Sequence, residues 1–178
     1  MRIKDDIEAS NTYLAKALSP YLVNKSIAEI ERTLKRLMEV YVRDFEWIQK
    51  DLFQIYRRKK LPFQIYHYHY IACVIGAKFQ KHGAIGTSHG FLRNYEQFSA
   101  VNSKLKQLGN VGVKSPKKNR NNRYSTIGKC AEIKAAYQLN SKSKISQLRD
   151  IEFTNAYRPR TFQVIERCAT CQFIFGDV

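Results

Sequence analysis

Acidic residues are few and long apolar segments are absent in this sequence. The 178 residues contain 31 Lys and Arg against 15 Asp and Glu, which gives a formal net charge of +16 at pH 7. No run of about 18 apolar residues occurs, so a transmembrane helix is not expected. The start, Met1-Arg-Ile-Lys-Asp-Asp6, lacks the apolar core of a signal peptide, so any export would depend on a dedicated machine or a larger parent polypeptide.

Cysteine is scarce as well, and one cysteine stands apart from the other three. Cys73 lies in the apolar segment 71–75 and is expected to be a small buried hydrophobic residue. Cys130, Cys168 and Cys171 have the spacing of a metal site. Such thiols must stay reduced, which favours a cytoplasm over an oxidising compartment.

These three cysteines form two short motifs. Cys130-Ala-Glu132 is followed 38 residues later by Cys168-Ala-Thr-Cys171. A catalytic zinc ion takes three protein ligands and keeps its fourth position for water. The metal lowers the pKa of this water, so that it loses a proton near neutral pH. A glutamate beside the metal, without binding it, can shuttle the proton. The spacing therefore predicts Cys130, Cys168 and Cys171 as Zn2+ ligands and Glu132 as the catalytic residue.

Local sequence places the cysteines at the starts of two helices. Residues 130–139 are rich in good helix formers, so Cys130 is expected in a first helical turn, where free amide groups favour a thiolate. Residues 161–165 are expected to form a short buried strand. Cys168 and Cys171 would then share one face of a second helix and direct both thiols to one point.

Two other kinds of site remain open at this stage. A structural zinc site would need a fourth protein ligand, which one of the four histidines could supply. The chain would then be a basic nucleic-acid-binding module without catalysis, and Glu132 would have no role beside the metal. A redox-active Cys-x-x-Cys pair is disfavoured, because its surroundings do not resemble a βαβ unit. The histidines are His67, His69, His82 and His89.

Residues 128–135 (GKCAEIKA) and 158–171 (RPRTFQVIERCATC) together resemble the cytidine deaminase superfamily. The bacterial YwqJ-like toxin deaminases are most similar, since they use Cys-Ala-Glu where many relatives use His-Ala-Glu. The resemblance implies a deaminase-like α/β/α sandwich with both motif helices on one sheet, abbreviated at the C-terminus because only seven residues follow Cys171. The chain departs from the common pattern at Arg167, where proline is usual.

The expected function is hydrolytic deamination of a nucleobase, cytosine or adenine, in nucleic acid or a nucleotide. Zn2+ held by the three cysteines would activate water, and Glu132 would carry the proton to the departing ammonia. The resemblance further implies an antibacterial toxin or effector domain with an acidic immunity protein as partner. Such a domain would act in the cytoplasm of a target cell after specialised secretion.

A basic segment precedes the first motif. Residues 114–123 carry five positive charges and end seven residues before Cys130, and residues 109–128 are expected to form a loop. This loop would either bind phosphates or serve solubility. Tyr124 and Tyr157 could stack on a base or pack in the core. The residues predicted to bind nucleic acid are Lys114, Lys117, Lys118, Arg120, Arg123, Arg158 and Arg160.

A long amphipathic helix is expected near the N-terminus. Ser26 and Glu29 have the spacing of a capping box. Apolar residues then recur every three or four positions, which predicts a helix over residues 26–58 that ends before Pro62. Its apolar stripe is expected to pack on its own domain, to form an oligomer, or to act as an adaptor surface.

The expected organisation is a helical region of residues 1–60 followed by a deaminase-like domain of residues 61–178, with a boundary that could lie as late as residue 105. Residues 63–80 fit a strand or a buried helix. Among them, His67 and His69 would share one strand face. The remaining expectations are turns at Gly83, Gly86 and Gly90 and a helix over residues 91–108 that ends at Gly109.

Overall fold

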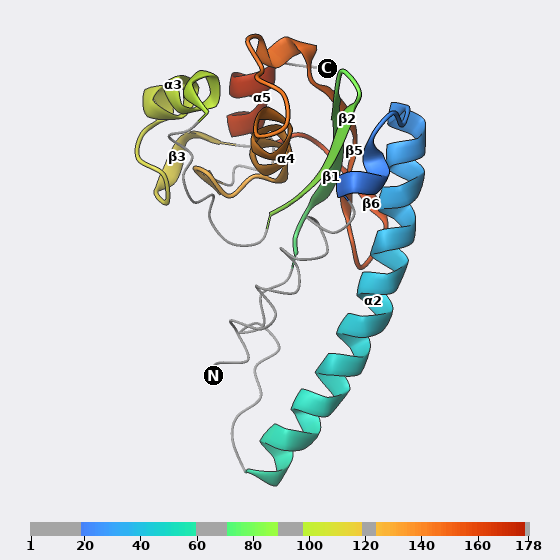
Figure 1. The fold of residues 1–178 in the computed structure, drawn as a ribbon. Coiled ribbons are helices and arrows are strands. Elements are labelled where there is room, and N and C mark those ends of the chain that lie inside the picture. The colour runs from blue at the N-terminus through green and yellow to red at the C-terminus, as the bar shows by residue number, and fades with distance from the viewer. Residues whose placement is uncertain (1–18, 60–70, 89–97, 119–123, 177–178) are drawn as a thin grey trace.

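The computed structural model describes residues 19–59, 71–88, 98–118 and 124–176 (Figure 1). The side chains of residues 44–53, 55 and 56 lie outside that description. The expectations for His67, His69, His89, Gly90, Arg120 and Arg123 also lie outside the described residues. The elements are η1 (Ser19–Leu22), α2 (Ile27–Arg58), β1 (Val74–Phe79), β2 (His82–Thr87), α3 (Ser99–Leu108), β3 (Lys114–Lys118), β4 (Tyr124–Thr126), α4 (Ala131–Asn140), η4 (Leu148–Asp150), β5 (Glu152–Arg158), β6 (Gln163–Ile165) and α5 (Ala169–Phe175).

Four antiparallel strands form the central sheet, in the order β2-β1-β5-β6. Successive residues of a strand point to opposite faces. Val74 and Ile85 pack with α2 on one face, whereas Ile75 and Ala84 belong to the cluster that includes α4 on the other. Figure 1 shows α2 on one side of the sheet and α3, α4 and α5 on the other. The described residues form three layers, which confirms the predicted α/β class.

The long helix α2 begins at the predicted capping box. The Ser26 N–H donates to Glu29 Oε2 (2.8 Å) and the Glu29 N–H donates to Ser26 Oγ (3.3 Å), so two free amides of the first turn are satisfied. Ile30, Leu34 and Met38 follow at steps of four and are buried against the sheet. This part of α2 therefore packs on its own chain, as predicted. Within the described ranges, no helix is both long and apolar enough to cross a membrane.

A hydrogen bond ties α2 to the sheet. The Tyr157 hydroxyl on β5 donates to the Glu31 carboxylate on α2, and Asn155 Nδ2 donates to the same oxygen at 3.4 Å. The bond from Tyr157 is the main reason that the pKa of Glu31 is lowered, in spite of partial burial. Tyr157 is 5% exposed. Of the two roles considered for this ring, packing in the core is the one observed.

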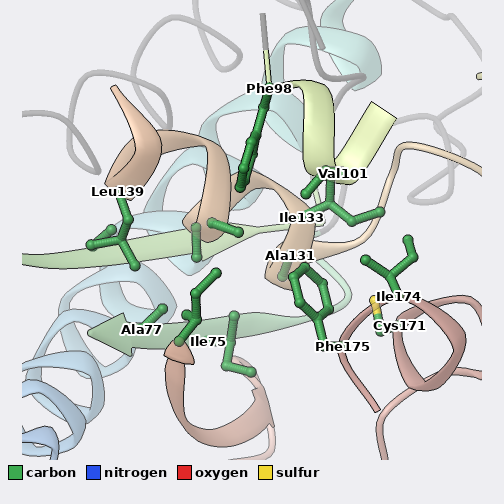
Figure 2. Close-up of a cluster of buried hydrophobic side chains, with 14 of the residues drawn as sticks. Ile75, Ala77, Phe98, Val101, Ala131, Ile133, Leu139, Cys171, Ile174 and Phe175 are labelled. Carbon is green, nitrogen blue, oxygen red and sulfur yellow. The ribbon is translucent and has the colours of Figure 1, made fainter. Parts of the chain in front are cut away.

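The opposite face of the sheet carries the larger core (Figure 2). Val101 of α3, Ile133 and Leu139 of α4 and Cys171 of α5 are fully buried there, together with Phe98. Each large apolar side chain buried in this way contributes about 1.5–3 kcal/mol. The seven-residue helix α5 is too short to be stable alone, so this packing must hold it in place.

The turns expected at Gly83 and Gly86 are wrong, because both residues lie inside β2. The hairpin between β1 and β2 turns at residues 80–81 instead. A Cβ added at Gly83 would approach Leu22 Cβ to 2.7 Å, and one added at Gly86 would approach the Ala131 carbonyl oxygen to 1.9 Å. Both glycines thus permit close approach by elements that cover the sheet, which a local turn pattern cannot reveal.

Two further local expectations need correction. Residues 109–128 are not one continuous loop, because β3 and β4 within them pair as a separate two-stranded sheet. Residues 161–165 are a strand only from Gln163 to Ile165 and are not buried, since β6 is an edge strand and Val164 is 55% exposed. The expected helix end at Gly109 is correct, because the Gly109 N–H donates to the Leu105 carbonyl at 3.1 Å.

Candidate metal centre

Three thiols from two helix starts meet on the α4 side of the sheet. Cys130 is the N-cap residue of α4 and Cys168 is the N-cap residue of α5, with Cys171 further along α5. The three Sγ atoms lie within 4.8 Å of one another, and Cys130 Sγ is 3.3 Å from Cys168 Sγ. Cys171 is fully buried and the other two are half-buried. The two motifs therefore converge, as their spacing predicts.

The spacing of the thiols suits a tetrahedral metal ion. With Zn–S bonds of about 2.3 Å, two thiolates on one zinc ion lie about 3.8 Å apart. The observed separations, 3.3 Å for one pair and at most 4.8 Å for the others, are compatible with that geometry. Thiolates are soft ligands that select zinc, Cu(I) or an iron–sulfur cluster over magnesium or calcium.

Within the part of the chain that the structure describes, no fourth His, Cys, Asp or Glu joins the thiol group. His82, one of the candidate fourth ligands, begins β2 opposite Phe79. The thiol group lies toward the other end of β2, where Gly86 meets the start of α4. A centre with three protein ligands keeps one position for water or substrate, which is the pattern of a catalytic site.

Glu132 lies beside the thiols without joining their group. It stands in the first turn of α4 and is 4% exposed. Burial and then the charge of Cys168 raise the pKa of its carboxyl, while its own amide, Cys171 and Arg167 lower it in part. Carboxylates are rarely buried to this degree without a specific partner. Its position next to a three-thiol group, outside the ligand set, is what proton transfer at a metal centre requires.

The thiols share negative charge unequally. Hydrogen bonds from Cys130 and Cys171 lower the pKa of Cys168 to about 3, and the amides at the start of α5 contribute. The bond to Cys168 raises the pKa of Cys130, and burial raises that of Cys171. Hydrogen bonds from the other two thiols therefore favour the thiolate form of Cys168. A cation at the centre would favour the thiolate form of all three.

Close contact with the sheet fixes the start of α4. A Cβ at Gly86 would lie 1.9 Å from the Ala131 carbonyl oxygen and 2.8 Å from the Ala135 nitrogen, so the backbone of α4 rests directly on β2. Ala131 stands between Cys130 and Glu132, and this contact therefore positions both side chains.

Replacing Gly86 with alanine should destabilise the protein by about 3 kcal/mol, because a methyl group overlaps a backbone that cannot rotate away. Urea unfolding measures the loss. Metal content should fall as well, since the start of α4 is displaced from α5. A Gly86→Ala protein with the stability and metal content of the wild type would show that α4 is not seated in this way.

Cys73 lies nearer to this centre than its sequence suggested. It directly precedes β1, at the end of the sheet where β2 and β5 finish. Its N–H donates to Ser88 Oγ at 2.9 Å, and its carbonyl accepts from the Ser88 N–H at 2.9 Å. Burial raises the pKa of the Cys73 thiol, and the nearby charges of Glu132 and Cys168 raise it further. The local apolar pattern around Cys73 gave no signal of this position.

The predicted basic residues are divided among separate elements. Lys114, Lys117 and Lys118 lie on β3, which contacts α5. Arg158 ends β5 and Arg160 lies in the exposed turn that follows. Two of these lysines contact aromatic rings, and the sequence pattern does not predict either contact. Lys117 Nζ lies 4.3 Å from the centre of the Phe173 ring, and Lys118 Nζ lies 5.3 Å from that of Tyr124.

The described residues thus form a three-layer α/β protein with a candidate metal centre of three cysteines and an adjacent buried glutamate. No family model, curated protein or solved structure matches the chain. The function therefore has to follow from the chemistry of this centre and from the motifs that form it.

Proposed function

We propose that the protein is a zinc-dependent hydrolytic deaminase that acts on a nucleobase. The observation that carries this proposal is the buried Glu132 carboxyl beside three converging thiols that lack a fourth protein ligand among the described residues. A purely structural site has no use for a buried carboxyl at this place. The resemblance of both motifs to the cytidine deaminase superfamily supports the same reading.

Cys130, Cys168 and Cys171 would hold the metal, and the N-terminal turns of α4 and α5 orient them. A bound zinc ion supplies Lewis acidity, which makes water a nucleophile near neutral pH. The overall reaction replaces the amino group of the ring carbon by oxygen from water and releases ammonia. In it, a Glu132 carboxylate oxygen accepts the proton of the attacking water and delivers it to the departing nitrogen.

The biological role that we propose is that of a toxin or effector domain, which rests on the motif resemblance. An acidic immunity protein would be the matching partner, because the net charge of +16 attracts an anionic surface. Complementary charge speeds the encounter of such pairs more than it raises their final affinity.

A deamination assay with metal analysis tests the proposal. The reduced protein should contain about one zinc per chain, and it should convert cytosine or adenine in DNA or RNA, read by sequencing, or release ammonia from nucleotides. A folded, zinc-loaded protein without activity on any of these substrates would favour a nucleic-acid-binding module with a structural zinc. A protein that binds no metal would contradict both readings.

A further inference from the structure

An open pocket lies along α5, next to the candidate metal centre. It has a volume of ≈ 540 Å³ and is lined by Lys117, Lys118, Ala169, Gln172 and Phe173. Ala169 directly follows Cys168, so the pocket begins at the residue beside one of the thiols.

Lys117, Lys118 and Phe173 line this pocket, and cation–aromatic contacts join them to Lys104 and Tyr124. Phe173 has two ammonium groups over its ring, Lys117 at 4.3 Å and Lys104 at 5.4 Å. Lys118 Nζ lies 5.3 Å from the ring centre of Tyr124, and that tyrosine is 47% exposed. We call these five residues the lysine–aromatic groove. Four elements contribute to it. Lys104 lies on α3, the other two lysines lie on β3, Tyr124 begins β4, and Phe173 lies on α5.

The sequence around the lysines of the groove is poor in acidic residues. Between Glu96 and Glu132 the sequence contains eight Lys and Arg and no Asp or Glu. Among the described residues, the three lysines of the groove form no salt bridge, and their ammonium groups lie instead over aromatic rings. Such contacts at exposed sites are weak, so a phosphate can draw the ammonium away and leave the ring face open. A ligand with both phosphates and planar rings satisfies the lysines and the rings together.

We propose that the lysine–aromatic groove binds single-stranded nucleic acid, with phosphates on Lys104, Lys117 and Lys118 and unpaired bases on Tyr124 and Phe173. Stacking of this kind requires bases that are free of a partner strand, which favours a single strand over a duplex. The groove itself is argued from its own contacts. That the bound strand is also the substrate rests on the proposed function, because the groove leads away from the thiol group along α5.

A polar contact between two of the elements that carry the groove supports a rigid platform. Ser125 Oγ lies 2.7 Å from Thr170 Oγ1, and this hydrogen bond joins β4 to the first turn of α5. Thr170 is fully buried. Tyr124 and Phe173 are therefore fixed on two elements that are linked to each other directly beside Cys168 and Cys171.

Fluorescence anisotropy with labelled oligothymidylate and oligouridylate of about 12 nucleotides tests the groove in the full chain. Lys117→Ser with Lys118→Ser should weaken binding about tenfold or more and lower the slope of log affinity against log salt by about 1.4, since each single-strand phosphate contact accounts for about 0.7. Tyr124→Leu should weaken binding about tenfold without changing that slope, because it removes stacking and no charge. The two probes distinguish DNA from RNA.

The matched control removes two exposed lysines elsewhere, Lys81 in the β1–β2 turn and Lys144 after α4. Equal weakening by Lys81→Ser with Lys144→Ser would overturn the proposal in favour of general charge attraction, and so would tighter binding of a duplex of the same length. Binding through the groove without deamination would keep this inference and overturn the proposed function. Deamination of a single strand that the groove variants leave unchanged would keep the proposed function and overturn the role of the groove in binding its substrate.

Discussion

Glu132→Gln should lower the rate of deamination about 1000-fold and leave the metal content unchanged. Glutamine keeps the size and polarity of the side chain but cannot accept a proton, and positioned acid–base groups contribute about 100- to 10,000-fold to a rate. Because Glu132 lies outside the thiol group, the three ligands remain in place. Ammonia release measures the rate, and elemental analysis of the same sample measures zinc.

Glu166→Gln is the matched control for this experiment. Glu166 is also a glutamate close to a motif, two residues before Cys168, but it is exposed. Its replacement should leave the rate within about twofold of the wild type, as is usual for surface substitutions away from a site. Equal loss of activity in both variants, or full activity in Glu132→Gln, would remove Glu132 from the mechanism.

Cys171→Ser should abolish stable metal binding. The serine hydroxyl is a poor ligand for a soft metal site, and loss of even a supporting partner of a metal ligand costs about 10- to 100-fold in affinity. Cys171 is also fully buried in the core, so the variant should unfold at a lower temperature. Zinc per chain after dialysis and a thermal unfolding curve, with and without chelator in the wild type, measure both effects.

Cys73→Ala provides the comparison for the second experiment. Cys73 is half-buried near the same centre but does not belong to the thiol group. This variant should keep about one zinc per chain, because the three ligands of the proposed site are intact. Loss of zinc from Cys73→Ala would show that the ligand set has been assigned wrongly, and retention of zinc by Cys171→Ser would show the same.

The parts of the structure that could be predicted are those encoded in short sequence patterns. The capping box at Ser26 and Glu29 and the apolar stripe of α2 depend on residues three or four apart, so the local sequence predicts both. The meeting of Cys130 with Cys168 was predictable for another reason. Each thiol stands at a helix start, and the chemistry of a metal ligand set supplies the long-range information that spacing alone lacks.

The parts that were predicted wrongly depend on contacts between distant segments. Gly86 is a glycine because the backbone of α4 lies against it, and no residue near it in the sequence carries that information. The strand β3 has the sequence Lys-Ser-Pro-Lys-Lys, which has the composition of a loop and becomes a strand only by pairing with β4. The sequence does not indicate that Phe173 contacts Lys104 and Lys117, because these residues lie on three separate elements.

Along the chain, Cys130 comes before β5 and β6 and Cys168 comes after them, which has a topological consequence. Cys130 and Cys168 are 38 residues apart, and the segment between them contains both strands that complete the sheet. An ion bound by both cysteines closes this segment into a loop, much as a disulfide would. For a loop of about 40 residues, such closure reduces the entropy of the unfolded chain by the equivalent of about 4 kcal/mol. Occupancy of the centre would therefore set how readily the last third of the chain unravels.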